Sequence, residues 1–372
     1  MPSIDVMNLG RTWVELDLSA LEANVRDFVS ELAPVPLMAV VKANAYGHGA
    51  TLVARCALAS GASWLATATV TEAAQLRADG INAPCLVLGY TPPSHVLEAV
   101  RLDLDLTVFD LDVIAALEDA GAREGCQAKA HLKVDTGMTR LGILPEEVAG
   151  FVAAARTKSH VSLDGIFTHL RKGQDRESSA EQLDRFEAAV RAAEGVGHTF
   201  RLRHAANSAA WHHLPEARLD LVRSGGEILG LSTADKRRRR PVLTFKSTVA
   251  QLHTVEAGTS VGYGDSFRSG TRMRVATIAV GYGDGLRRGP GTWESVLIRG
   301  RRHPLIGDVS MDMAAVDVST DPSIAAGDQV VLVGRQRGQE ITVDELAQRL
   351  GTINYEVVTG IMARVPRTGT RS

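Results

Sequence analysis

The feature that most constrains this chain is a regular alternation of short apolar runs with longer amphipathic stretches over about its first 225 residues. Such runs are typical of buried parallel strands, and the stretches between them have the three- or four-residue apolar spacing of helices. The helical stretches include residues 50–59, 70–78, 110–120, 146–155 and 180–193. The candidate strands are residues 37–42, 64–68, 85–88, 104–109, 128–134, 161–168, 200–203 and 219–223. Eight strand–helix units predict a closed (β/α)8 TIM barrel.

One strand–helix pair precedes this series. Residues 13–18 alternate as a strand, and Ser19 is then expected to cap a helix that runs through Leu32. Glu22 lies three residues after Ser19, which is the spacing of a capping box. This pair lies outside the eightfold count.

Past Gly230 the pattern changes to β-rich runs separated by Gly, Pro and Asp turns. These runs are residues 249–255, 273–280, 296–299, 314–318 and 330–333. We therefore expect a barrel domain over residues 1–235 and a mostly β domain over residues 236–372, with the N-terminal strand a candidate member of the β domain. The basic run at residues 236–240 is interpreted as a solvated linker face rather than a phosphate or nucleic-acid patch.

Composition narrows the class of protein. The chain has 372 residues with 41 Lys and Arg against 43 Asp and Glu, a net charge of −2, so it has no general attraction to nucleic acid or anionic membranes. A small molecule is the expected partner. No apolar run reaches the roughly 18 residues of a membrane span, and the start of the chain lacks a signal-peptide pattern, so we expect a cytoplasmic protein. Three scattered cysteines, Cys56, Cys85 and Cys126, are interpreted as reduced packing residues.

In a barrel, functional side chains lie where strands end and in the loops that follow. Lys42 closes an otherwise apolar run. Burial would lower the pKa of this amine and make it a nucleophile, although a lysine can also extend from a strand end to solvent. Further polar residues follow the later strands and should converge on the same mouth: Lys133, Arg140, His169, Asn207, Ser208 and Arg223.

An anion site is expected after the last strand. Gly225 and Gly226 let backbone N–H groups approach an anion, and phosphate sites in barrels favour this region. The sequence therefore predicts a phosphorylated cofactor. His204, His212 and His213 lack the spacing of a metal site and have no cysteine partners, so we expect no metal.

The segment from Ala39 to Gly49, which reads Ala-Val-Val-Lys-Ala-Asn-Ala-Tyr-Gly-His-Gly, resembles the cofactor-attachment segment of the alanine racemase family, a group of fold-type III pyridoxal phosphate enzymes. The resemblance covers nearly the whole chain. Further segments are similar to family motifs in the family's order: residues 133–142, 204–210, 261–264, 281–285, 310–312, 353–357 and 364–367.

The resemblance implies that pyridoxal 5'-phosphate is attached to Lys42 and that the enzyme is an isomerase. The amine of Lys42 would act as the base on one face of the substrate α-carbon. Tyr263, from the second subunit of a head-to-tail homodimer, would act on the opposite face. Inversion at carbon needs a proton removed from one side and another delivered to the other, which fits two bases.

The same resemblance assigns the cofactor contacts. Arg223 would face the pyridine nitrogen, where a guanidinium keeps that nitrogen unprotonated and the ring a weaker electron sink. His169 would hold Arg223 and flank the ring. The residues expected around the phosphate are Tyr46, Ser208 and Tyr355, with Asn207 beside them and the backbone of Gly225 and Gly226 assisting.

On the substrate side, Arg140 would contact the phenolic oxygen of the cofactor and the substrate carboxylate, to which its planar fork is suited. Lys133 matches a lysine that supports this arginine and that is carbamylated in many family members; the sequence leaves the carbamylation of Lys133 itself open. Met311 and Asp312 resemble the substrate loop of the neighbouring subunit, and Tyr282 has a supporting place at the interface.

Three positions depart from the family pattern. Glu227 introduces an acid near the expected phosphate, the loop after His169 carries the basic pair Arg171 and Lys172, and Asp308 stands where the family usually has arginine. Charge therefore differs around the expected entrance, and we hypothesise that the preferred substrate or the turnover differs from the family norm.

The leading function is interconversion of L- and D-alanine, which would supply D-alanine as a peptidoglycan precursor. Racemisation of serine or another small amino acid is an alternative. A related pyridoxal phosphate-dependent decarboxylase is another, although the glycine-run and cysteine-bearing motifs of those enzymes are missing. A third alternative is a non-catalytic cofactor-binding barrel protein, which would lack a β domain with a residue like Tyr263.

Overall fold

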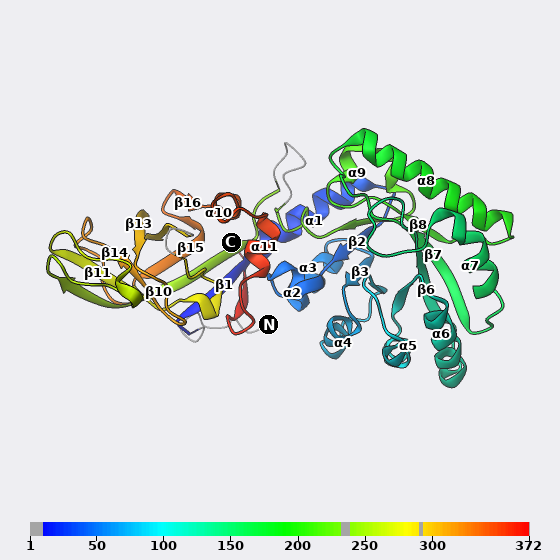
Figure 1. Ribbon diagram of the computed structural model, residues 1–372, viewed down its shortest axis with the longest axis horizontal. Helices are drawn as coiled ribbons and strands as arrows, with labels where there is room; N and C mark the ends of the chain where they lie inside the picture. The colour runs from blue at the N-terminus through cyan, green and yellow to red at the C-terminus, as the bar shows by residue number, and fades with distance from the viewer. Residues whose placement is uncertain (1–9, 232–238, 290–292, 372) are drawn as a thin grey trace. The chain divides into compact units, whose positions relative to one another are not determined.

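The computed structural model describes residues 10–231, 239–289 and 293–371, and the chain divides into two compact units. One unit contains residues 20–45 and 50–240, and the other contains residues 1–19, 46–49 and 241–372. Figure 1 labels the elements of both. The expected domain boundary between residues 235 and 236 lies outside the described residues.

The first unit contains a parallel sheet of eight strands in the order β8-β7-β6-β5-β4-β3-β2-β9. The sheet is nearly closed, since the Asp220 amide donates to the Arg203 carbonyl at 3.0 Å between the two end strands. The barrel prediction is therefore confirmed, and the bounds of each strand lie within three residues of its predicted range. The strands are β2 (Leu37–Val40), β3 (Trp64–Thr67), β4 (Cys85–Val87), β5 (Asp105–Val108), β6 (Ala128–Lys133), β7 (Val161–Phe167), β8 (Leu202–His204) and β9 (Val222–Ser224).

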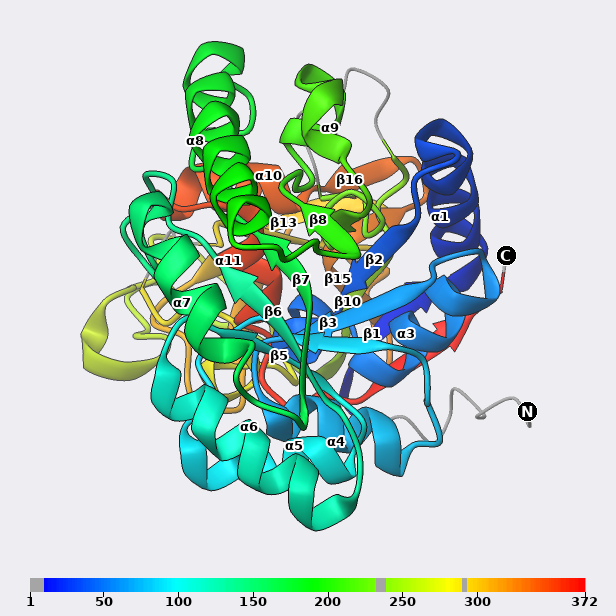
Figure 2. The same cartoon turned by 90° about the vertical axis from the view of Figure 1, so that its right-hand side faces the viewer.

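Helices lie outside these strands (Figure 2). Local capping explains several boundaries. Thr69 accepts from the Glu72 amide at the start of α4, and Gly125 ends α6 at a φ of 66°. The helices are α3 (Ala50–Ala59), α4 (Val70–Ala78), α5 (Val96–Arg101), α6 (Leu111–Glu124), α7 (Val148–Ala155), α8 (Arg176–Gly195) and α9 (Ala210–His213). Helix α1 (Leu18–Leu32) begins at Leu18, so Ser19 lies in its first turn and not at the expected cap.

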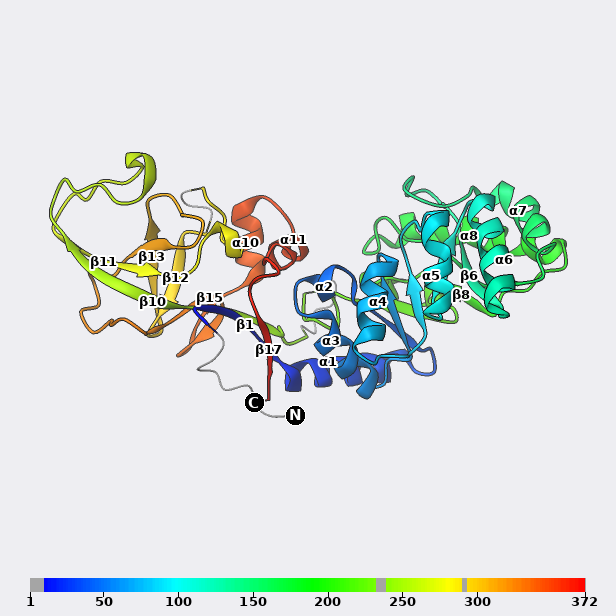
Figure 3. The ribbon, with the colours of Figure 1, turned by 90° about the horizontal axis from the view of Figure 1, so that it is seen from below.

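The second unit is built on a nine-stranded sheet in the order β16-β15-β12-β13-β14-β11-β10-β1-β17, with β15 also pairing with β10. The N-terminal strand β1 runs antiparallel to β10 and parallel to β17 (Figure 3). Met273, Val275 and Ile306 form an apolar cluster inside this unit. The strands are β1 (Thr12–Asp17), β10 (Leu243–Val255), β11 (Met273–Ile278), β12 (Ser295–Ile298), β13 (Arg301–Ile306), β14 (Ala314–Asp317), β15 (Gln329–Gln336), β16 (Gln339–Ile341) and β17 (Arg367–Thr370).

Two short helices of this unit, α10 (Val343–Leu350) and α11 (Asn354–Thr359), were not expected from the sequence. All three cysteines are free. Cys85 is buried, but Cys126 is exposed, so its interpretation as a packing residue is wrong. Within the described ranges, no helix combines the length and the apolar character that crossing a membrane requires.

Candidate active site

The predicted site residues of the first unit lie at or just past the carboxyl ends of barrel strands. Lys42 follows β2, and Lys133 is the last residue of β6. Arg223 lies in β9, which pairs directly with β2 through the register Met38 to Arg223. The ends of β2 and β9 are therefore neighbours at the barrel mouth.

The segment after Lys42 has an unusual backbone. Residues Ala43–Tyr46 all have φ between 51° and 54°, which is one turn in the left-handed region. Such a conformation costs an L-residue about 1–2 kcal/mol, so surrounding contacts must hold it. Glu72 accepts hydrogen bonds from the Ala43 and Ala68 amides, both at 2.7 Å, and the Asn44 side chain accepts from the Ala50 amide at 2.8 Å. This turn fixes the backbone on which Lys42 is mounted.

The surroundings of Lys42 lower the pKa of its amine. Burial lowers its pKa most, the positive charges of Arg140 and Arg223 lower it further, and Glu72 opposes them. A neutral amine is nucleophilic and can accept a proton. This outcome agrees with the reactivity expected for Lys42 from its place at the strand end.

Arg223 is buried and held by four hydrogen bonds. Its Nη1 donates to the His204 Nδ1 at 2.6 Å and to the His204 carbonyl, and its Nη2 donates to the carbonyls of Thr168 and Ala205. Burial lowers the pKa of the guanidinium to about 9. Among the described hydrogen bonds, Nε takes part in none, so it is the guanidinium nitrogen left to meet a ligand atom.

Behind Arg223 lies a chain of buried polar groups. Because the His204 Nδ1 accepts from Arg223, its Nε2 carries the proton and donates to the His131 Nδ1 at 2.9 Å. The His131 Nε2 then lies 3.5 Å from Asp105 Oδ1. Burial, followed by the charge of Arg223, holds the pKa of His204 well below its usual value, so the imidazole stays a neutral acceptor.

His169 has a different place from the one expected. The hydrogen-bond partner of Arg223 is His204, whereas the His169 Nε2 lies 3.4 Å from the Asn207 amide nitrogen. Burial and the charges of Arg223 and Arg140 hold the pKa of His169 well below its usual value. Asn207 in turn caps the turn after β8, since its Oδ1 accepts from the amides of Ala209 and Ala210. Asn207 therefore fixes the loop beside His169.

The loop after β9 has the character of an anion site. Gly225 and Gly226 are buried, and among the described hydrogen bonds neither amide donates to an acceptor. Buried backbone N–H groups are rarely left unpaired, so these two donors point to a ligand. The hydroxyl of Ser224, the last residue of β9, lies 3.0 Å from the hydroxyl of Ser208, which follows β8. Amides and hydroxyls are the donors that fit a phosphate group.

Two further expected phosphate ligands meet in the second unit. The rings of Tyr46 and Tyr355 have centroids 5.4 Å apart, and burial raises the pKa of the Tyr46 phenol, which keeps it a neutral donor. Gly47 lets the chain approach α11 closely, because a Cβ there would lie 2.1 Å from the Val358 carbonyl oxygen.

A second lysine at the mouth is also perturbed. Burial, and then the charge of Arg223, lowers the pKa of Lys133 to about 7, and its Nζ donates to the Val134 carbonyl at 2.7 Å. The following loop turns on Asp135, whose Oδ1 accepts from three successive amides, residues 137–139. This turn leads to Arg140, which is exposed. A planar cation is thus presented where the resemblance places the substrate carboxylate.

The second unit presents the residues assigned to the neighbouring subunit. Tyr263 is 65% exposed, Met311 is 53% exposed and Tyr282 is 39% exposed. All three side chains are therefore accessible at the surface of this unit.

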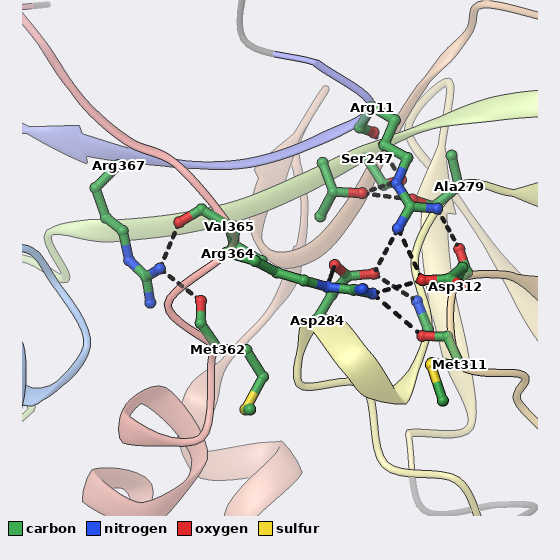
Figure 4. Close-up of polar contacts among 12 residues, drawn as sticks. Arg11, Ser247, Ala279, Asp284, Met311, Asp312, Met362, Arg364, Val365 and Arg367 are labelled. Atoms are coloured by element: carbon green, nitrogen blue, oxygen red, sulfur yellow. Dashed lines mark hydrogen bonds and ion pairs between the residues drawn. The ribbon is translucent and has the colours of Figure 1, made fainter.

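A network of ionic contacts fixes the Met311–Asp312 segment (Figure 4). Arg364 bonds to Asp284 and Asp312, both at 2.8 Å, and Arg11 donates to the Asp312 carbonyl at 2.8 Å. The hydrogen bond from Arg364 holds the pKa of the Asp312 carboxyl below its usual value. The loop is therefore pinned while Met311 points outward.

The structure also shows where the departures from the family sequence pattern lie. Glu227 is buried and paired with Arg239, so it does not line an entrance, and the solvated-linker interpretation is wrong for Arg239, whose side chain is 8% exposed. Asp308 lies 3.2 Å from Arg288. Residues 236–238 of the basic run lie outside the described residues.

Arg171 and Lys172 border a pocket of about 410 Å³ that also includes Met138, His169, Leu170, Gly173, Gln174, Asp175, Asn207 and Ala209.

Sequence reasoning missed His131, Asp105 and the role of His204. His131 alternates with Lys133 along β6 and so shares its face of the strand, which is the signal that would have drawn attention to it. No group of acidic, histidine or cysteine side chains in the described parts of the chain could hold a metal ion.

Comparisons with known proteins agree along the whole chain. Residues 16–233 match the family model "Alanine racemase, N-terminal domain", and residues 242–369 match "Alanine racemase, C-terminal domain". The chain is 43% identical over 371 residues to the alanine racemase of Symbiobacterium thermophilum, with 98% of each chain covered. It is 42% identical to that of Desulfovibrio desulfuricans over 95% of this chain and 97% of the relative.

Solved structures give the same result. The alanine racemase of Bacillus anthracis with bound L-Ala-P superposes with a TM-score of 0.91 at 35% identity, covering 97% of this chain and 95% of that one. The alanine racemase of the D-cycloserine producer Streptomyces lavendulae superposes with a TM-score of 0.90 at 35% identity, covering 100% and 98%.

Proposed function

Because the chain belongs to the alanine racemase family, we propose that it interconverts L- and D-alanine, with pyridoxal 5'-phosphate held at the barrel mouth. The observation that carries this proposal is the meeting of three groups at the ends of the neighbouring strands β2 and β9. These are the amine of Lys42, whose pKa is lowered, the Nε donor of Arg223, and the amides of Gly225 and Gly226, which donate to no acceptor among the described hydrogen bonds. An aldehyde, a ring nitrogen and a phosphate on one ligand would satisfy all three.

When bound, this cofactor supplies an electron sink for the carbon from which a proton is removed. The chain's own residues set how strong that sink is. Arg223 stays charged at neutral pH, and its Nε would donate to the ring nitrogen of the cofactor without releasing a proton, which would keep that nitrogen unprotonated. A weaker sink limits reactions other than proton exchange. Arg140 would orient the substrate through its carboxylate.

Two bases on opposite faces would invert the α-carbon. Lys42 would move the proton on one face, and Tyr263 of a second copy would move it on the other. The exposure of Tyr263 supports this assignment, since a phenol at a loop tip of one chain is free to complete the site of another. We thus propose a homodimer with shared sites. Its cytoplasmic location and its role in supplying D-alanine for the cell wall stay predictions.

Alanine is the expected preferred substrate. Two of the three altered charges are neutralised within the chain, Glu227 by Arg239 and Asp308 by Arg288. The sequence-based reason for a different substrate is therefore weakened, and serine remains the second amino acid to test.

The test is to load the purified protein with cofactor and incubate it with single L-amino acids in deuterated water. We expect loss of the α-proton signal together with loss of optical rotation for L-alanine, and neither in Lys42→Ala. Lys129→Ala, at the opposite end of the strand that holds Lys133, should retain full activity because its ion pair with Asp103 is exposed.

Exchange without inversion would contradict the role of Tyr263. Release of carbon dioxide would replace racemisation with decarboxylation, and faster turnover of serine would overturn the assignment of alanine.

A further inference from the structure

The loop after β9, residues 225–231, contains an acidic side chain, whose negative charge disfavours the binding of a phosphate. Backbone hydrogen bonds from the amides of Leu229, Gly230 and Leu231 to the carbonyls of Gly225, Glu227 and Gly226, respectively, fold it into a compact turn. Glu227 follows directly after the two unpaired glycine amides, and its side chain is 1% exposed. A buried carboxylate cannot be screened by water, and it would repel a phosphate bound at adjacent backbone groups.

Arg239 neutralises this carboxylate from the far end of the linker. Its Nε lies 3.1 Å from Glu227 Oε1, and its Nη2 lies 2.6 Å from Glu31 Oε2 on α1. Asp27 lies 3.8 Å from Nη1, and the guanidinium lies over the Phe28 ring. The side chains of Asp27 and Glu31 are 67% and 28% exposed, so water screens their charges, whereas the buried carboxylate of Glu227 lies in direct contact with Arg239.

Helix α1 holds the two segments together at a second point. The Asn24 amide donates to the Ile228 carbonyl at 3.1 Å and to the Arg240 carbonyl at 2.8 Å, and Asn24 Oδ1 accepts from the Arg240 amide at 3.0 Å. Asn24, Asp27, Phe28 and Glu31 follow the three- and four-residue spacing of one helix face. The linker end and the loop are thus joined to the same face, which keeps Arg239 beside Glu227.

We propose that Arg239 is a positioning residue for phosphate binding: it cancels the charge of Glu227 so that the amides of Gly225 and Gly226 can hold the phosphate of the cofactor. This inference rests on the proposed function for the identity of the ligand. It predicts an effect specific to the phosphate, because the charge of Glu227 acts on an anion next to the loop and not on the aldehyde end of the ligand.

The test is to titrate the cofactor-free full-length protein with pyridoxal phosphate and with pyridoxal, which lacks the phosphate, following tryptophan fluorescence and absorbance. Arg239→Gln should raise the Kd for pyridoxal phosphate about tenfold, while the Kd for pyridoxal changes little. The double variant Arg239→Gln/Glu227→Gln should recover most of the affinity for pyridoxal phosphate, since neither charge remains. The matched control is Arg101→Gln, which breaks an exposed ion pair with Glu124 and should change neither Kd.

The single variant Glu227→Gln keeps the inference testable if Arg239→Gln fails to fold. Glutamine can still accept a hydrogen bond from Arg239, so this variant should keep the local contact. We expect its affinity for pyridoxal phosphate to equal or exceed that of the wild type. A weaker affinity in Glu227→Gln, no change in Arg239→Gln, or no recovery in the double variant would each overturn the inference. Equal Kd values of the wild type for pyridoxal and pyridoxal phosphate would also overturn the inference. Failure of the wild type to bind either compound would contradict the proposed function itself.

Discussion

At the scale of single residues, the main feature of the barrel mouth is that several of its cationic side chains are buried. Burial is the largest cause of the lowered pKa of Lys42, Lys133 and Arg223, and mutual repulsion adds to it for the two lysines. The lowered pKa makes the neutral amine more accessible for both lysines, and the neutral amine is the form that attacks a carbonyl carbon or adds carbon dioxide. Arg223 stays charged, because its lowered pKa of about 9 is still above neutrality and four acceptors surround it.

The lowered pKa of Lys133 predicts that the free energy of unfolding depends on pH. Its pKa is about 7 in the fold and about 10.4 in an unfolded chain, so between these values the unfolded chain binds the extra proton. The free energy of unfolding should then rise as the pH rises from about 7 to 10, by a few kcal/mol at most. Lys133→Met should flatten this rise, as measured by urea unfolding of the cofactor-free protein at several pH values.

The same measurement needs two controls. Buffers must be free of carbon dioxide, because a neutral amine can be carbamylated, and mass spectrometry of the intact protein would detect the added group. Lys129→Met is the matched variant, since the pKa of Lys129 is raised and its contribution is lost only above the range measured. An equal slope in the wild type and Lys133→Met would show that Lys133 does not titrate in this range.

At the scale of elements, the turn that follows β2 depends on one side chain from a neighbouring helix. Glu72 lies in the first turn of α4 and accepts from two amides, one after β2 and one after β3. Glu72→Ala should cost about 1–3 kcal/mol of stability, because two amides lose a charged acceptor. It should also slow the uptake of cofactor by Lys42, since the left-handed turn relaxes without this support.

Uptake can be followed by the absorbance of the bound cofactor, and stability by thermal unfolding. Glu98→Ala is the matched control, because Glu98 occupies the first turn of α5 and is exposed. If Glu72→Ala were to lose stability but bind the cofactor at the wild-type rate, the turn would not depend on Glu72.

The elements that could be predicted from the sequence are those whose pattern has one interpretation. All eight barrel strands lie in or beside short runs that contain apolar residues, and α3 and α4 have the predicted bounds. β13 was missed because Arg301, Arg302 and Pro304 break the pattern of a strand. α5 has six residues after two prolines, which is too short for a periodic signal.

The missed parts of the site have a similar explanation. The partner of Arg223 proved to be His204 because hydrogen bonding depends on which side chains share the barrel interior, and the linear sequence does not order them. The left-handed turn after Lys42 was missed because alanine and asparagine rarely adopt that conformation in succession. By contrast, the positions of Lys42 and Arg223 could be predicted, because functional side chains of a barrel lie where its strands end.

At the scale of the whole molecule, the two proposed bases belong to different units: Lys42 to the barrel unit and Tyr263 to the β unit. Among the described residues, the β unit exposes six large apolar side chains, and the proposed second copy would bury such side chains at an interface. These residues are Tyr263, Tyr282, Met311, Met313, Ile353 and Met362. If each site takes one base from each chain, no site can work with both bases missing, but two defective chains can complete each other.

Subunit complementation follows from this arrangement. Lys42→Ala and Tyr263→Phe, each alone, should be nearly inactive, because one base is missing from every site. In a mixed dimer, purified through two different tags, one site would combine Lys42 of the Tyr263→Phe chain with Tyr263 of the Lys42→Ala chain. With one complete site of two, the mixed dimer should have about half of the wild-type activity. Pairing Lys42→Ala with a Lys42→Ala/Tyr263→Phe chain gives no complete site and should stay inactive. If the mixed dimer were as inactive as this control, both bases would have to come from the same chain.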